Sequence, residues 1–146
     1  MQPTLDLVAD LAKKSGLVWI ESGGRTQAVW HELVGDAVCV VGDGAEQPLP
    51  DVRDGDTVTL LLRAKTNRQL AASVGATVEA VRPDSPHWDE VTAALKAGRL
   101  NLPDMDTAIQ RWARESRVLR LLPFEPVTLA TDREPWRRLS RPRLSG

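Results

Sequence analysis

The sequence predicts an α+β fold built around a small antiparallel β-barrel. Short stretches with strand character follow one another at close spacing, separated by Gly-containing turns. Helical patterns occur before the first strand and again late in the chain, whereas a parallel α/β sheet requires helices and strands to alternate throughout. The 146 residues suffice for one hydrophobic core. We therefore expect a single domain over residues 1–130 and an Arg- and Pro-rich tail over residues 131–146.

The first third of the chain predicts a helix followed by a strand meander. Apolar residues recur at helical spacing between Thr4, a candidate N-cap, and Gly16, a candidate stop. Gly23-Gly24 is typical of a hairpin turn between two strands. The strands expected in this region cover residues 17–22, 27–33 and 37–41. A loop rich in Gly, Pro and Asp then spans residues 42–55.

Residues 57–62 form an uncharged apolar run that leads directly into a cluster of cations. Such a run fits a strand covered on both faces or lying inside a small closed barrel. Side chains alternate along a strand, so Arg63 and Lys65 are expected on the same side. A pair of cations with neighbouring donors suits a phosphate or polycarboxylate, although a solvated strand end carries the same charges. The neighbouring residues of the cluster are Thr66, Asn67 and Arg68.

The second half of the chain predicts two further strands, two helices and a closing strand. Residues 69–73 fit either a helical turn or a strand edge, and residues 76–81 fit a strand. Ser85 as N-cap and Pro86 at the first helical position predict a helix that ends near Gly98. The remaining expected elements are a helix over residues 104–115, a strand over residues 117–122 and a weak strand over residues 127–130.

Composition and spacing argue against several classes of protein. The net charge is −1 and the basic residues are dispersed among acids, which disfavours nucleic-acid binding. No apolar run approaches the roughly 20 residues that span a bilayer, and no leader pattern opens the chain, so a cytoplasmic protein is expected. Cys39 lies in an apolar run and fits a buried thiol. His31 and His87 lack metal-ligand spacing, so no metal site is expected.

The order of elements, taken with particular residues, resembles the split-barrel flavin-binding family related to pyridoxamine 5'-phosphate oxidase. The resembling parts are the helix before the first strand, Ala28-Val29-Trp30-His31 in a strand and Arg63-Ala64-Lys65 at a strand end. Residues 88–112 are similar to a helical insertion in actinobacterial members, some of which use a deazaflavin. The acidic loop over residues 42–55 departs from the family, which usually has basic and hydroxyl residues there.

The resemblance implies binding of FMN or a deazaflavin and transfer of a hydride to a small organic substrate. Arg63 and Lys65 would hold the phosphate, and Thr66 and Asn67 would donate hydrogen bonds beside Arg68. Trp30 would border the cofactor ring, although a barrel Trp also fits the core. The family's cofactor pocket lies between two subunits, so a homodimer is expected. The alternative is a non-catalytic barrel that has lost its cofactor and binds a ligand or a partner.

Overall fold

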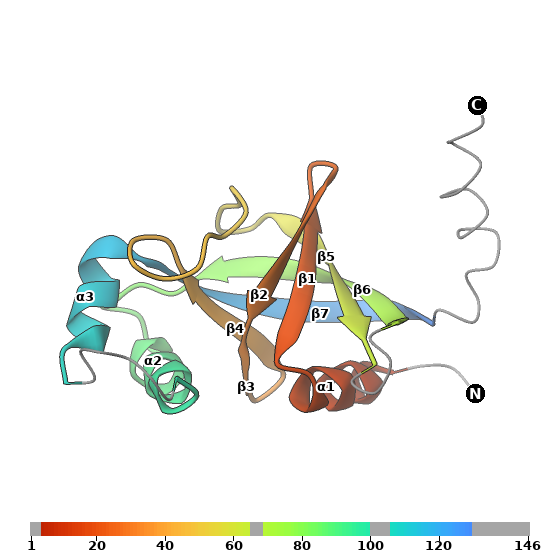
Figure 1. Ribbon diagram of the computed structural model, residues 1–146, viewed down its shortest axis with the longest axis horizontal. Coiled ribbons are helices and arrows are strands. Elements are labelled where there is room, and N and C mark those ends of the chain that lie inside the picture. The colour runs from red at the N-terminus through yellow and green to blue at the C-terminus, as the bar shows by residue number, and fades with distance from the viewer. Residues whose placement is uncertain (1–3, 65–68, 100–105, 130–146) are drawn as a thin grey trace.

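The computed structural model describes residues 4–64, 69–99 and 106–129 of the chain. Within them, seven antiparallel strands form one sheet in the order β2-β1-β5-β6-β7-β4-β3 (Figure 1). The expected antiparallel α+β architecture, with an N-terminal helix and two later helices, is confirmed. The strands are β1 (Leu17–Ser22), β2 (Arg25–Trp30), β3 (Glu32–Val34), β4 (Ala37–Gly42), β5 (Thr57–Arg63), β6 (Leu70–Ala80) and β7 (Arg117–Leu129); the helices are α1 (Leu5–Lys14), α2 (Trp88–Ala97) and α3 (Ala108–Glu115).

The sheet curls into a half-barrel because its two edge strands are consecutive in the chain. β2 ends at Trp30 and β3 begins at Glu32, so His31 alone separates the two edges. The expectation of one strand over residues 27–33 is therefore wrong. His31 is 6% exposed, and its Nε2 donates a hydrogen bond to the carbonyl oxygen of Ala12 at 2.8 Å. This contact with α1 ends β2 at the point where the chain turns.

The barrel core consists of the inward-facing residues of the strands and one side of α1. Inward positions alternate with outward ones along β5, where Val58, Leu60 and Leu62 are buried while Leu61 is only half-buried. The strand is thus covered fully on one face only, which fits the second expected alternative, a strand of a small barrel, and not a strand covered on both faces. Figure 1 shows α1 across one end of the barrel, where Val8 and Ala12 join the same core.

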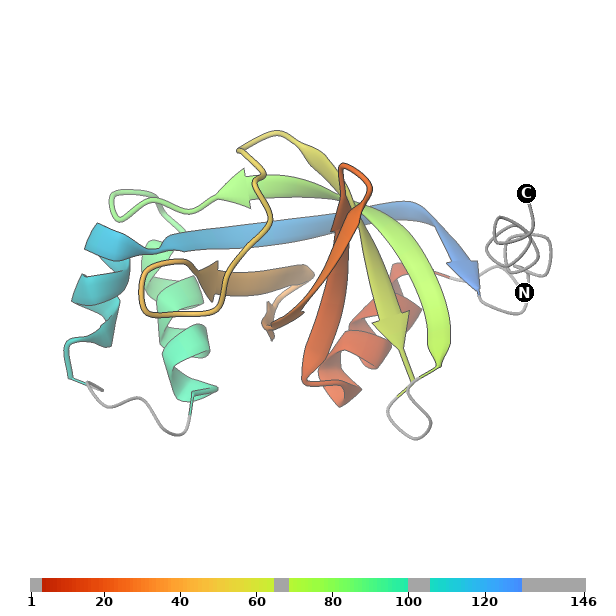
Figure 2. The ribbon, with the colours of Figure 1, turned by 45° about the horizontal axis from the view of Figure 1, so that its top comes forward.

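A second core lies on the outer face of β4, under α2 and α3. The outward-facing Ala37, Cys39 and Val41 pack there against Trp88 and Trp112. Figure 2 shows both helices gathered at this end of the molecule. Burial raises the pKa of the Cys39 thiol to about 12. Cys39 is therefore a structural thiol, as expected, because only the thiolate is a good nucleophile.

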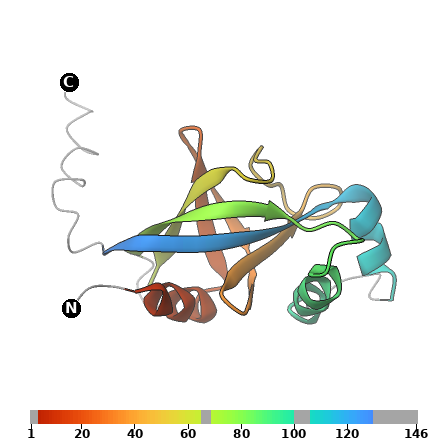
Figure 3. The ribbon, with the colours of Figure 1, turned by 180° about the vertical axis from the view of Figure 1, so that it is seen from behind.

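β6 and β7 are longer than the sequence predicts, and they run side by side along the back of the molecule (Figure 3). Residues 69–73 and 76–81 were expected as separate elements, and so were residues 117–122 and 127–130. The two strands stay paired across a register shift, beyond which Gly75 pairs with Phe124, so each strand continues between the two segments predicted for it. A Cβ at Gly75 would lie 2.6 Å from the Phe124 ring, so glycine lets this ring lie against the strand.

The helix ends differ from the predicted ones for local reasons. Ser85 does not cap α2, because its Oγ donates to the carbonyl oxygen of Arg82 at 2.8 Å and the helix begins three residues later. Thr4 occupies the N-cap position of α1 without a side-chain bond. α3 begins at Ala108, and the expected start at residue 104 and the tail over residues 131–146 lie outside the described residues. No helix in the described ranges is long and apolar enough to cross a membrane.

Candidate functional site

Three neighbouring strands bring Arg63 and Trp30 to the same outer face of the sheet. The outward residues of β1 include Leu17 and Trp19, and those of β5 include Leu61 and Arg63. Leu17 pairs with Trp30 of β2, and Trp19 pairs with Leu61. Side chains that share a face of paired strands are neighbours. The two residues that the sequence selects from separate motifs therefore lie on one continuous surface, with β1, which carries Leu17 and Trp19, between them.

Arg63 stands at the wall of a hollow between the C-terminal end of α1 and the end of β5. The hollow has a volume of about 490 Å³. The Arg63 guanidinium stacks on the Trp19 ring, 4.7 Å from its centroid. Lys14 supplies a second cation to the lining, and its Nζ also contacts Asp10 of the same helix at 3.1 Å. The complete lining is Lys14, Ser15, Gly16, Leu17, Trp19, Arg63 and Ala64.

The balance of charge in this Arg63 hollow favours an anion. The C-terminus of α1 faces it, and a helix C-terminus carries roughly half a negative charge. Lys14 and Arg63 carry two full positive charges, and the Lys14–Asp10 pair is mostly exposed and so contributes little. The positive charge outweighs the helix dipole. A phosphate or carboxylate is the chemical group that such a hollow suits.

The rest of the predicted cation cluster lies outside the described residues. This applies to Lys65, Thr66, Asn67 and Arg68. The segment is bracketed by a backbone hydrogen bond in which Ala64 donates to Gln69 at 2.9 Å. Since Ala64 also lines the Arg63 hollow, the chain leaves the hollow directly into the segment that carries these residues. Their contact with a phosphate stays a prediction.

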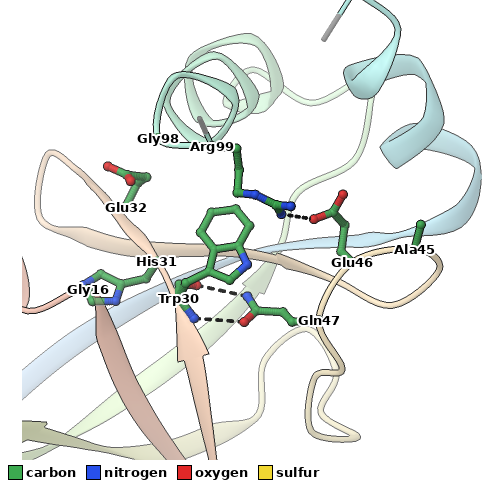
Figure 4. Close-up of a pocket in the computed structure, with 9 residues that line it drawn as sticks. All are labelled: Gly16, Trp30, His31, Glu32, Ala45, Glu46, Gln47, Gly98 and Arg99. Atoms are coloured by element: carbon green, nitrogen blue, oxygen red, sulfur yellow. Dashed lines mark hydrogen bonds and ion pairs between the residues drawn. The ribbon is translucent and has the colours of Figure 1, made fainter. Parts of the chain in front are cut away.

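Trp30 lines a second, larger hollow of about 580 Å³, shown in Figure 4, which we call the Trp30–Arg99 hollow. Gly16 lines both hollows, so the two are adjacent. The Arg99 guanidinium covers one face of the Trp30 ring, 4.8 Å from its centroid. Gln47 accepts a hydrogen bond from the Trp30 backbone N–H at 2.9 Å and donates one to its carbonyl oxygen at 3.0 Å. Trp30 therefore borders a hollow, and one of its faces already carries a cation; its contact with a cofactor ring stays a prediction.

Glu46 holds Arg99 in place from behind. Its side chain is 1% exposed, and its carboxylate accepts hydrogen bonds from Arg99 Nη1, Arg111 Nη2 and Trp112 Nε1. Burial raises the pKa of Glu46, but the donors Trp112, Arg111 and Arg99 outweigh burial, so the pKa lies below its ordinary value. The carboxylate is therefore charged at neutral pH.

The opposite wall of the Trp30–Arg99 hollow consists of Glu32 and His31 (Figure 4). Burial raises the pKa of Glu32 above its ordinary value. Burial also lowers the pKa of His31, against the opposing effect of the hydrogen bond to Ala12. Because a carbonyl oxygen only accepts, Nε2 carries the proton and Nδ1 is the bare nitrogen of a neutral imidazole. His31 is thus a buried histidine whose Nε2 is hydrogen-bonded to the backbone of α1.

The sequence missed Trp19, Arg99, Glu46 and Gln47 as parts of the site. Only the unusual count of five tryptophans hinted at Trp19, and Glu46 lies in the acidic loop that departs from the resembling family. Arg99 follows the last residues of a helix with nothing in its neighbours to single it out. Among the described residues, no group of three or more His, Cys, Asp or Glu side chains is placed to hold a metal ion.

Comparison with protein-family models and with curated proteins gives no match. Solved structures do match, among them the heme storage protein from Vibrio cholerae, with 13% identity and a TM-score of 0.57 over 88% of this chain and 95% of that chain. The FAD binding protein from Mycobacterium smegmatis is 17% identical, with a TM-score of 0.57 over 86% of this chain and 94% of that chain. An F420 reductase is 15% identical, with a TM-score of 0.51 over 82% and 94%. These matches confirm the α+β split-barrel fold of the pyridoxamine 5'-phosphate oxidase type.

Proposed function

From this split-barrel fold, we propose that the protein binds a flavin or a deazaflavin and transfers a hydride to a small organic substrate. The observation that supports it most is the Arg63 hollow, where two cations line a space beside an indole ring. The matched FAD binding protein and F420 reductase show that this fold occurs in proteins named for both cofactor types. Membership of an actinobacterial subgroup stays a prediction.

The residues of the Arg63 hollow fit the phosphate end of such a cofactor. A guanidinium binds a phosphate through two parallel hydrogen bonds, and an ammonium adds a point charge. The Trp19 ring restricts the Arg63 side chain, so less conformational freedom is lost on binding than for an unsupported arginine. Lys65, Thr66, Asn67 and Arg68 follow directly in the chain. We assign the phosphate to this hollow and the ring to the side nearer Trp30.

The bound flavin or deazaflavin supplies the hydride chemistry, and the chain binds and orients it. Arg63 and Lys14 fix the phosphate end, while the outward strand face between Trp19 and Trp30 provides an apolar surface for a planar ring. No side chain needs to act as a nucleophile in this scheme. The Cys39 thiol is consistent with that, because it is buried beneath α2 and α3.

We further propose that two copies of the chain pair through this outer face. Phe124 is 43% exposed and Leu17 is 41% exposed, and Trp19 and Leu61 are only half-buried on the same side of the sheet. Apolar groups on one sheet face favour association, and a homodimer is the most common way to bury them. A second copy on this face would also cover the Arg63 hollow and exclude water from it.

The test of the phosphate site is the double variant Arg63→Ala/Lys65→Ala. Each charge-assisted hydrogen bond contributes about 1.5–3 kcal/mol, so we expect the affinity for FMN or the deazaflavin to fall by roughly two to four orders of magnitude. Titration followed by visible absorbance measures this change. Arg25→Ala, at an exposed position on β2, is the matched control and should retain wild-type affinity. Equal binding by wild type and the double variant would place the phosphate elsewhere.

A further inference from the structure

The Trp30–Arg99 hollow contains an arginine that the proposed phosphate site does not use. Arg99 lies just beyond α2, and its guanidinium is held at two points, by the face of Trp30 and by the carboxylate of Glu46. Glu46 is itself fixed by Arg111 and Trp112 of α3. Since Gln47 fixes the backbone of Trp30 on both sides, every support of Arg99 is anchored. The guanidinium is therefore preorganised, and ordering it for a ligand costs little further entropy.

Stacking on Trp30 and ion pairing with Glu46 leave some N–H donors of the Arg99 guanidinium available to a ligand. A guanidinium has five N–H donors in one plane, and stacking on a ring uses its face rather than its edges. Among the contacts of the described residues, only Nη1 is engaged, by Glu46. The Arg99 side chain is 29% exposed, and it lines the hollow of Figure 4. Its remaining edge donors can reach a ligand in that hollow.

The other walls select the charge of that ligand. Glu32 faces the hollow from β3, and Glu46 lines its far side. Arg99 and Arg111 already compensate the charge of Glu46, but the Glu32 carboxylate repels a dianionic phosphate more strongly than a singly charged carboxylate. A raised pKa at Glu32 also makes its protonated form easier to reach, and a protonated carboxyl group can donate a hydrogen bond to a ligand oxygen. The walls therefore favour a monoanion over a phosphate.

Gly98 keeps Glu32 at this wall. A Cβ on Gly98 would lie 2.0 Å from Glu32 Oε2 and 2.5 Å from its Cδ. The carboxylate thus packs against the bare backbone at the end of α2. Any larger residue at position 98 would push Glu32 out of its place and change the hollow opposite Arg99.

We infer that the Trp30–Arg99 hollow binds the carboxylate of a small organic acid through the edge of the Arg99 guanidinium. As far as it concerns catalysis, this inference rests on the proposed function and names an organic acid as the substrate class. The two adjacent hollows then bind different groups: the Arg63 hollow binds the cofactor phosphate, and the Trp30–Arg99 hollow binds the substrate carboxylate. Binding of the acid itself requires no cofactor.

The test is calorimetric titration of benzoate, benzamide and inorganic phosphate into the cofactor-free protein. We expect benzoate to bind, and the uncharged isostere benzamide to bind at least tenfold more weakly. Arg99→Gln should weaken benzoate about 10- to 100-fold, because it removes hydrogen bonds to a charged group. Arg99→Lys keeps the positive charge but lacks the planar set of guanidinium N–H donors. Its affinity for benzoate should therefore lie between that of wild type and that of Arg99→Gln. Arg114→Gln, at an exposed position of α3, is the control and should bind as wild type does.

Three outcomes would overturn the inference: no benzoate binding, equal binding of benzoate and benzamide, or unchanged benzoate affinity in Arg99→Gln. Phosphate binding that is tighter than benzoate binding and is lost in Arg99→Gln would also overturn it. The proposed function is tested separately, by titrating FMN and the deazaflavin into the same samples. Arg63→Ala/Lys65→Ala should lose cofactor affinity and keep benzoate affinity. Benzoate binding without any cofactor binding would refute the proposed function and leave the carboxylate site standing.

Discussion

Two arginines of this protein lie over indole rings, Arg63 over Trp19 and Arg99 over Trp30. Such contacts are worth about 0.5–1 kcal/mol at exposed sites, too little to stabilise the fold by much. Their larger effect is to hold long, flexible cations in one orientation beside the two hollows. We therefore expect these stacks to serve ligand binding more than stability.

At the same scale, His31 predicts an acid sensitivity of the fold. Burial holds its pKa below the ordinary value of 6.5, so the unfolded chain takes up a proton at a higher pH than the folded one. The stabilisation that the neutral His31 provides is complete above about pH 6.5, and it is lost as the pH falls through the folded-state pKa. We expect the free energy of unfolding to decrease between pH 7 and pH 5.

The measurement is chemical denaturation of wild type and two variants across that pH range. His31→Gln should flatten the dependence. His87→Gln, at the other histidine of the chain, is the matched control. If the free energy of unfolding of His31→Gln depends on pH as strongly as that of wild type, another group controls the acid response.

At the scale of elements, the acidic loop over residues 42–55 has a structural role. Asp43 pairs with Arg117 of β7, and Glu46 bonds to Arg99 and to two residues of α3. Arg117 also donates to the carbonyl oxygens of Leu49, Pro50 and Val52. The loop thus connects the barrel to the helices. Its departure from the resembling family does not touch the Arg63 hollow, because none of its residues lines that hollow.

Glu46→Gln tests this connection. The change leaves Arg99 and Arg111 without a buried carboxylate, so we expect a loss of about 1.5–3 kcal/mol of stability. Because Glu46 has a lowered pKa, its contribution is present above the ordinary value of 4.5 and lost as the pH falls through the folded-state pKa. The stability difference between wild type and variant should therefore shrink below pH 4.5. A difference that is constant with pH would contradict the ionised assignment.

The sequence predicts most elements because their signals are local. Gly23 and Gly24 have positive φ, as the predicted hairpin turn requires, and apolar periodicity marks α1 correctly. The break at His31 depends on a contact with α1 nineteen residues earlier, and no local pattern reports it. Likewise, Arg99 and Glu46 are 53 residues apart, so the Trp30–Arg99 hollow exists only once the fold has formed. Trp30 and Arg63 could be selected from the sequence because each belongs to a short motif.

For the molecule as a whole, the outer sheet face predicts self-association. Sedimentation at micromolar concentration should give about twice the 16.0 kDa mass of one chain. Leu61→Glu places a charge in the middle of the face and should produce monomers. Ala93→Glu, at an exposed position of α2, should leave the assembly intact. A wild-type protein that sediments only as a monomer would refute the pairing.

The central claim, that the barrel holds a flavin or deazaflavin, is tested most directly by adding each cofactor to the purified wild-type chain. Visible absorbance and the fluorescence of the cofactor report binding without any assumption about the substrate. We predict a saturable spectral change with one of the two cofactors, at roughly one equivalent per chain. Failure of both FMN and the deazaflavin to bind would contradict the account and leave a non-catalytic barrel in its place.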